Sequence, residues 1–300
     1  MLKTIITCYL LLSISFGIAQ EKDTSISIIN YQKEVIAKLT GKNTISKNRF
    51  LRQRASYEER FLSAEYLASE LKRSGWSFEL QKYRTPQSNY FLDLFFNPNK
   101  GINVVGKLLA SKPTKKYLIL GAHYDSERNS PGAVDNASGV ALCLALAKEL
   151  QQFKHRQYNI IIAFFDQEED DEVGSNVFVE KIQNENFEVH SVHIFDLIGY
   201  DSDNDFALTL QSPAPLLEDV YLRKAKEENI SIQIIGGAAS DNKPFLEAKY
   251  ATIHPFEELD DRTPYYHSPQ DSYETVNFEF LANTTQYIGN VLSEIIENNE

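Results

Sequence analysis

The spacing of apolar residues along the chain changes between a helical and a strand period. Apolar residues recur at helical spacing in residues 57–73, which we expect to form an amphipathic helix that ends near Gly75. An alternating pattern at residues 77–83 and short apolar runs at residues 102–109, 117–121, 160–165 and 192–198 are typical of strands. Residues 20–48, by contrast, are polar and only weakly periodic.

A second kind of helix is predicted at residues 137–150, which are apolar on nearly every side. Only Lys148 and Glu149 carry charge there, so this helix should lie buried against a sheet. Further helices are expected at residues 176–184, 215–228 and 278–297. Short apolar strands alternating with helices predict one α/β domain whose central, mostly parallel mixed sheet carries helices on both faces.

We interpret residues 1–19 as a secretory signal peptide. Lys3 supplies a positive start, residues 5–18 are mostly apolar, and Gly17 and Ala19 are small residues at the positions that signal peptidase inspects. A membrane anchor is the alternative, but the apolar run is shorter than the roughly 20 residues that a span needs. We therefore expect residues 20–300 to form an exported domain, periplasmic or secreted, monomeric and without a stable membrane anchor.

The charge of the chain argues against nucleic-acid binding, and its cysteine content argues against a disulfide framework. The 42 Asp and Glu residues outnumber the 30 Lys and Arg residues, giving a net charge of −12, so nucleic-acid binding is not expected. Two cysteines cannot build a disulfide framework, and removal of the signal peptide would leave only Cys143, which lies in an apolar run and should be buried.

Candidate chemistry gathers where three of the predicted strands end. The side chains are His123 and Asp125 after residues 117–121, Glu168 and Glu169 after residues 160–165, and Asp196 after residues 192–195. In open α/β sheets, sites form in the crevice at the carboxyl ends of the strands. The sequence therefore predicts a metal cleft at this end of the sheet. Asp135, just before the buried helix, is either a helix cap or a carboxylate at the lip of that cleft.

Taken together, the chain resembles the M28 family of zinc peptidases, the co-catalytic aminopeptidases, which includes the glutaminyl cyclases. The resemblance spans roughly residues 50–295. It rests on segments that occur in this order: 123–126, 132–139, 168–169 with 174–175, 196–199, 240–241 and 266–271. The resemblance implies that residues 20–300 are an M28-like catalytic domain.

The resemblance also implies a site with two zinc ions. His123 and Asp196 would hold one ion, Glu169 and His267 the other, and Asp135 would bridge both. Zinc accepts imidazole nitrogen and carboxylate oxygen, so the residue types suit this role. The expected cofactor is therefore two zinc ions per chain.

Three further residues receive roles from the resemblance. Glu168 would be the general base, Asp125 would orient His123, and Asp241 would be a supporting acid near Glu168. The implied reaction is hydrolysis of the N-terminal peptide bond through a water that bridges the metals. The implied partner is a peptide with a free N-terminus.

The chain departs from its relatives in places. Asp171 occupies a position where many relatives carry glycine, and Asp tolerates left-handed backbone better than most residues. Adjacent glutamates on an extended strand would point opposite ways, so Glu168 and Glu169 require a kink at the strand end. The resemblance also implies a cis peptide bond after Asp135.

Two other functions remain open. A glutaminyl cyclase would use a single zinc ion to form N-terminal pyroglutamate. Such enzymes tend to carry tryptophan beside the final histidine, where this chain has Tyr266, and here both zinc shells are filled. A non-catalytic binding domain would be expected to have lost ligands, and this chain keeps them all.

Overall fold

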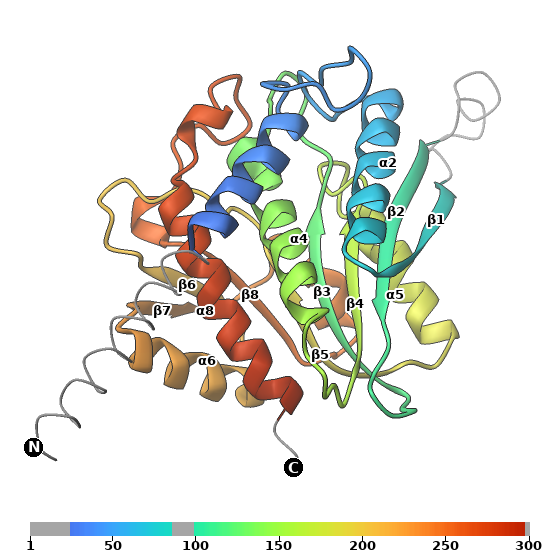
Figure 1. Ribbon diagram of the computed structural model, residues 1–300, viewed down its shortest axis with the longest axis vertical. Coiled ribbons are helices and arrows are strands. Elements are labelled where there is room, and N and C mark those ends of the chain that lie inside the picture. The colour runs from blue at the N-terminus through green and yellow to red at the C-terminus, as the bar shows by residue number, and fades with distance from the viewer. Residues whose placement is uncertain (1–24, 86–98, 298–300) are drawn as a thin grey trace, which may run out of the picture.

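Eight strands form the centre of the computed structural model, which describes residues 25–85 and 99–297 (Figure 1). The predicted signal peptide, residues 1–19, lies outside the described residues. The strand order is β1-β2-β4-β3-β5-β8-β6-β7. The strands are β1 (Ser77–Thr85), β2 (Asn99–Leu108), β3 (Lys116–His123), β4 (Asn159–Phe165), β5 (Glu188–Ile194), β6 (Leu208–Gln211), β7 (Ile232–Ile235) and β8 (Thr252–Glu257).

The sheet is mixed, with a parallel centre. β3 pairs in parallel with both β4 and β5, and β5 pairs in parallel with β8. β6 and β7 are also parallel, whereas β1 with β2, β2 with β4, and β6 with β8 are antiparallel. The predicted fold class is therefore confirmed. The carboxyl ends of β3, β4 and β5 meet at one edge, which is where the candidate chemistry was expected.

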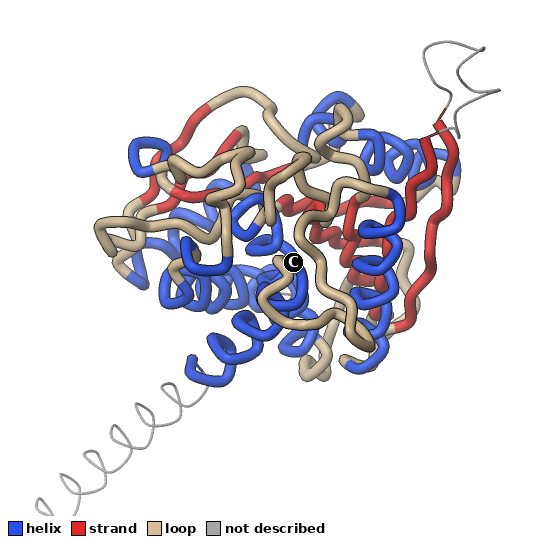
Figure 2. Tube along the Cα trace, turned by 90° about the horizontal axis from the view of Figure 1, so that it is seen from above, coloured by secondary structure: helices blue, strands red, loops and turns tan. Residues whose placement is uncertain are grey.

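Helices cover both faces of this sheet (Figure 2). They are α2 (Tyr57–Arg73), α4 (Ser138–Leu150), α5 (Val173–Asn184), α6 (Pro215–Glu228), α7 (Asn242–Glu247) and α8 (Phe278–Glu297). Short helical turns are η1 (Ala133–Ala137), η2 (Leu259–Asp261) and η3 (Tyr273–Thr275). Among the described residues, no helix combines the length and apolar character that crossing a membrane requires.

Two hydrophobic cores follow from this layering. The larger core joins one sheet face to residues of α2, α4, α6 and α8, and the smaller joins the other face to residues of α5 and α7. α4 is buried along its whole length apart from Lys148 and Glu149, as its sequence predicts, and Cys143 within it is fully buried and unpaired. Trp76 packs in the larger core, and its indole Nε1 donates to the Ala147 carbonyl.

Local signals placed several helix ends correctly. α2 begins at a capping box: the Glu59 N–H donates to Ser56 Oγ, and the Ser56 N–H donates to the Glu59 carboxylate. Lys72 and Arg73 lie in its last turn, where positive charge is favoured. α2, α6 and α8 have the bounds expected from the sequence.

Other elements were missed or misplaced. A helix over residues 25–39 was not predicted, because its buried face depends on few apolar residues, among them Val35, Ile36 and Leu39. The short elements β6, β7, β8 and α7 were also missed, and β8 contains Pro255, which is uncommon inside a strand. The strand expected at residues 192–198 instead ends at Ile194, and a loop carries Asp196.

Candidate metal centre

One histidine and two aspartates meet at the carboxyl end of β3. His123 is the last residue of that strand and is fully buried. Its Nε2 lies 3.2 Å from Asp135 Oδ1 and 3.3 Å from Asp196 Oδ1. Asp196 follows β5, the parallel neighbour of β3, and Asp135 lies in η1 at the start of the buried helix α4. Residues far apart in the sequence thus surround one ring nitrogen.

A second histidine faces the other oxygen of the same aspartate. His267 Nε2 lies 2.9 Å from Glu169 Oε2 and 3.4 Å from Asp135 Oδ2. Asp135 therefore presents Oδ1 to His123 and Oδ2 to His267. The five residues predicted as zinc ligands are gathered around this central carboxylate.

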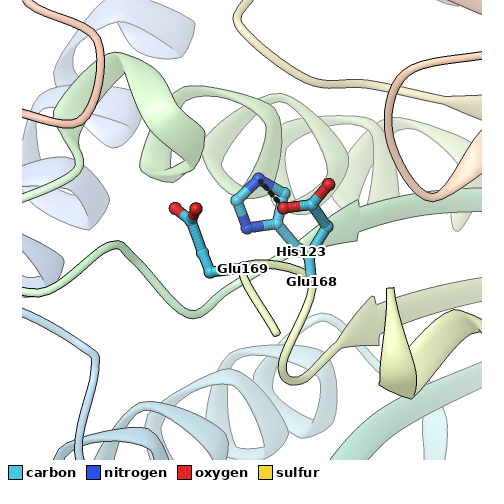
Figure 3. A group of neighbouring side chains, drawn as sticks. All are labelled: His123, Glu168 and Glu169. Atoms are coloured by element: carbon cyan, nitrogen blue, oxygen red, sulfur yellow. Dashed lines mark ion pairs between the residues drawn. The ribbon is translucent and has the colours of Figure 1, made fainter. Parts of the chain in front are cut away.

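The two adjacent glutamates reach the same cleft because the chain turns after β4. Gln167 has φ +60°, which breaks the extended backbone ahead of Glu168 and Glu169. In Figure 3 their carboxylates lie to either side of the His123 ring. Glu168 Oε2 is 4.0 Å from His123 Nε2. Asp171, which stands where the family resemblance implied glycine, adopts φ +69°.

Asp125 connects the His123 strand to the glutamate turn. Its Oδ1 accepts a hydrogen bond from the Glu168 N–H at 3.1 Å, and its Oδ2 accepts one from the Glu169 N–H at 3.2 Å. The same Oδ1 lies 3.4 Å from His123 Nδ1. Asp125 is thus placed to position both the histidine and the two glutamates.

The backbone around Asp135 is held by its neighbours. The Asp135–Asn136 peptide bond is cis, as the family resemblance implied. Asp135 does not cap α4: the Gly139 N–H donates to Asn136 Oδ1 instead, at 2.9 Å. Asp271 accepts hydrogen bonds from the N–H groups of Val134, at 2.8 Å, and Asp135, at 3.0 Å.

Three contributors to the centre received no role from the sequence. Asp271 lies in the last matched segment, so that segment was a usable signal for it. Arg54 is fully buried and donates to the carbonyls of Tyr124, Pro131 and Gly132, but nothing in its local sequence indicates this. Glu127 groups with Glu169 and His267, and its N–H donates to Glu169 Oε1 at 2.8 Å; its sequence context gave no signal either.

The pKa values of the carboxylates in the metal centre are shifted in opposite directions. Burial raises the pKa of Glu168 to about 10, and the charges of Asp196, Asp241 and Asp125 add to this rise against the opposing effect of His123. Burial, followed by the charge of Asp135, raises the pKa of Glu169 to about 8. Burial would also raise the pKa of Asp135, but hydrogen bonds with His123 and His267 hold it at about 2.

This donor set fits divalent zinc. Two imidazole nitrogens face several carboxylate oxygens in a mostly buried cleft, and zinc binds both donor types. Among the described residues, one possible ligand group is His123, Asp135 and Asp196, whose ligand atoms lie within 4.8 Å of one another. Cations here would stabilise the charged carboxylates that burial and mutual repulsion otherwise disfavour.

Asp241 and Tyr266 border the cleft. Asp241 directly precedes α7 and is fully buried; burial raises its pKa to about 7, and its charge helps to raise the pKa of Glu168. Its role as a supporting acid stays a prediction. The ring of Tyr266 stacks on that of His267 with centroids 3.7 Å apart.

His193 and His254 are buried and belong to no possible metal-ligand group within the described residues, and no chemistry was expected of them.

Known proteins share both sequence and fold with this chain. The sequence model for "Peptidase family M28" matches residues 103–292. Aminopeptidase YwaD of Bacillus subtilis is 30% identical over 168 residues, which cover 53% of this chain but only 37% of that relative.

Among solved structures, BSAP, a zinc aminopeptidase from Bacillus subtilis, superposes with a TM-score of 0.78 at 15% identity, covering 90% of this chain and 95% of that one. Glutaminyl cyclase of Porphyromonas gingivalis superposes with a TM-score of 0.71 at 16% identity, covering 89% and 98%. At these identities the superpositions establish a shared fold, whereas the match of the family model extends over more than half of the sequence.

Proposed function

Because the chain belongs to peptidase family M28, we propose that it is a zinc-dependent aminopeptidase that hydrolyses the N-terminal peptide bond of its substrates. One observation carries this proposal. Asp135 places its two carboxylate oxygens 3.2 Å and 3.4 Å from the Nε2 atoms of two different histidines. Such a carboxylate is suited to bridge two cations.

The proposed ligands divide into two sets around that carboxylate. His123 and Asp196 would hold one zinc ion, Glu169 and His267 the other, and Asp135 would contact both. When bound, the ions would supply Lewis-acid chemistry, lowering the pKa of water and polarising the substrate carbonyl. Because an aminopeptidase must also recognise the free amine, we propose peptides with a free N-terminus as the substrates.

Proton transfer falls to Glu168 in this proposal. Its carboxylate would take a proton from the attacking water and deliver it to the nitrogen of the leaving amine. Bound cations would favour the charged form of Glu168, which is the form a base needs, against the burial that raises its pKa. Asp125 would fix the positions of the Glu168 backbone and the His123 ring for this transfer.

The test combines metal counting with paired substrates. Native mass spectrometry should find two zinc ions per chain. The purified protein should hydrolyse aminoacyl anilides and leave their N-acetylated counterparts intact, because acetylation removes the free amine. Equal cleavage of blocked and free substrates, or activity without bound metal, would contradict the proposal.

A glutaminyl cyclase is the second candidate, since one solved cyclase shares the fold. The neighbour of His267 is Tyr266 rather than the tryptophan expected in cyclases, and residues for two zinc shells are present, so we rank this function lower. Peptides that begin with glutamine separate the two activities. Ammonia release and pyroglutamate formation without peptide cleavage would reverse the ranking.

We also propose that the enzyme is exported as a monomer after cleavage before Gln20. This rests on the pattern of Lys3, the apolar run and the small residues at Gly17 and Ala19. Mass spectrometry of the protein recovered outside the cytoplasm should give an N-terminus at Gln20. An intact Met1 in that fraction would contradict the cleavage.

A further inference from the structure

A second group of acidic side chains lies outside the metal centre, on two loops. The first loop follows β5 and carries Asp201, Asp203 and Asp205, and the second includes η2 and carries Glu258 and Asp261. We call these five residues the acidic loop cluster. Within the described residues, one possible ligand group joins Asp201, Asp203 and Asp261, and another joins Asp203, Asp205 and Glu258. In each group the ligand oxygens lie within 4.8 Å of one another.

Asp201 is the buried member of this cluster. Asp201 is only 9% exposed. Its Oδ2 is buried and has no hydrogen-bond partner within the part of the chain that the structure describes. Its Oδ1 accepts the Asn204 N–H at 2.9 Å. A buried carboxylate oxygen with no donor loses hydration without compensation, unless a cation takes the place of water.

The acidic loop cluster forms no ion pair with the basic side chains that the structure describes. No lysine, arginine or histidine of residues 25–85 and 99–297 forms an ion pair with any of its five members. Burial raises the pKa of Asp201, and Asp203 and Asp205 raise it further, against the backbone hydrogen bonds that the carboxylate accepts. No described basic side chain therefore neutralises the carboxylates of the cluster at ion-pair distance.

We propose that the acidic loop cluster binds one calcium ion, with the unpartnered oxygen of Asp201 as its buried ligand. The donors are all oxygens, and no histidine or cysteine belongs to either ligand group. Hard cations prefer such donors, whereas zinc favours sites that include nitrogen or sulfur. Calcium suits this group better than magnesium because it accepts six to eight oxygens in flexible geometry.

The first loop also has the spacing of a calcium-binding loop. Asp201, Asp203 and Asp205 occupy alternate positions, as the first three ligands of an EF-hand loop do. Phe206, at the sixth position, has φ +62°, a conformation for which EF-hand loops use glycine. The remaining carboxylates come from Glu258 and Asp261 rather than from further along the same loop.

Calcium here would join the two loops that border the metal centre. The first loop follows Asp196, and the second precedes His267 in the sequence. Ser202 already links them, since its N–H and its hydroxyl each donate to Asp261 at 2.6 Å. Bound calcium would add ionic contacts to this link and should raise the thermal stability of the protein.

Terbium luminescence provides a direct test on the full mature protein with its zinc retained. Tyr200 precedes Asp201 directly and should sensitise the emission of Tb³⁺ bound in the cluster. We expect calcium to displace the terbium with a stoichiometry of one ion per chain and to raise Tm, while the zinc content stays constant. Calorimetry with calcium chloride should give the same stoichiometry. A concentration of about 10 mM calcium exceeds the largest dissociation constants typical of extracellular calcium modules. Absence of binding at that concentration would overturn the proposal.

Matched variants locate the ion. Asp203→Ala removes an exposed ligand and should weaken calcium binding by about 10–100-fold or more. Asp260→Ala removes the same charge in η2 at an exposed residue outside both ligand groups, and it should leave affinity nearly unchanged. Equal affinities in the two variants, or terbium emission that calcium does not displace, would place the ion elsewhere and overturn the proposal.

Discussion

The metal centre and the acidic loop cluster are both rich in carboxylates, but they differ in every other respect. In the metal centre, carboxylates surround two histidines, and His123, Glu169 and Asp196 lie at or just after the ends of central parallel strands. In the acidic loop cluster, both ligand groups consist of carboxylates without histidine, they lie on two loops, and only Asp201 is buried.

The difference shows what turns a group of acids into a reactive site. Asp125 and Asp271 each accept two backbone N–H groups in the metal centre and so fix the loops that carry its ligands. The acidic loop cluster has the Ser202 link and short-range turns instead. A rigid set of nitrogen and oxygen donors suits catalysis, whereas a more flexible set of oxygen donors suits a cation that stabilises the fold.

The largest contrast should appear when a carboxylate becomes an amide in each region. Glu168→Gln keeps the shape of the side chain but removes the proposed base, so kcat should fall by about 10²–10⁴-fold with zinc content preserved. Steady-state kinetics on an aminoacyl anilide measures this. Asp260→Asn, beside the acidic loop cluster, is the control and should retain wild-type kcat. A Glu168→Gln variant with undiminished turnover would assign the base to another residue.

A smaller effect should follow from weakening the support of Asp135. Asp271→Asn replaces one of two acceptor oxygens with an amide that cannot accept the N–H it faces. We expect zinc affinity to fall by about 10–100-fold, measured by competition with a chelator. Wild-type affinity in this variant would show that the backbone of η1 holds its position without Asp271.

The smallest effect concerns a buried histidine that lies outside the metal centre and has no carboxylate neighbour among the described residues. His123 and His193 are equally buried on adjacent strands. Burial lowers the pKa of His193 to about 3, whereas at His123 the charges of Asp196 and Glu168 overcome burial and raise the pKa well above its usual value. His193 contacts the hydroxyls of Tyr221 and Ser191 instead.

The consequence for His193 is a loss of stability in acid. Its pKa is lower in the folded protein than the value of about 6.5 expected for the unfolded chain, so the unfolded chain binds the proton first as the pH falls. Stability present above pH 6.5 is therefore lost progressively towards pH 3. Between pH 7 and pH 5, this one group should lower the free energy of unfolding by about 2 kcal/mol.

Urea denaturation of the wild type and of His193→Gln at both pH values measures this contribution. The wild type should lose about 2 kcal/mol more than the variant, because glutamine does not titrate. Equal losses would mean that folding does not lower the pKa of His193.

The sequence predicted most of the fold where periodicity was strong. The uniformly apolar helix α4 and the apolar runs of β3 and β4 were recognisable because both faces of the central sheet are covered. β8, with His254 and Pro255, gave no such signal, since its place in the sheet depends on pairing with β5 and β6. Tertiary pairing of this kind leaves little trace in local sequence.

The candidate site was predictable to a similar degree. Its five proposed ligands were identified from the ordered motifs that carry the family resemblance, and the structure brings these residues together. Arg54 was missed because it acts by donating to backbone carbonyls, a role that any distant arginine could fill. The alternation of Asp201, Asp203 and Asp205 was visible in the sequence, but it gained meaning only when Asp261 was found beside it.

Arg54 has a consequence for where the catalytic unit begins. The family match starts at residue 103, yet this arginine holds the carbonyls of Tyr124, Pro131 and Gly132, and Arg60 lies 2.7 Å from Asp166 in a buried ion pair. A fragment trimmed to the matched boundary would leave those carbonyls and that carboxylate buried without their partners. The residues before the family match therefore contribute buried contacts to the same domain, and we expect residues 103–292 alone to be much less stable than the described chain.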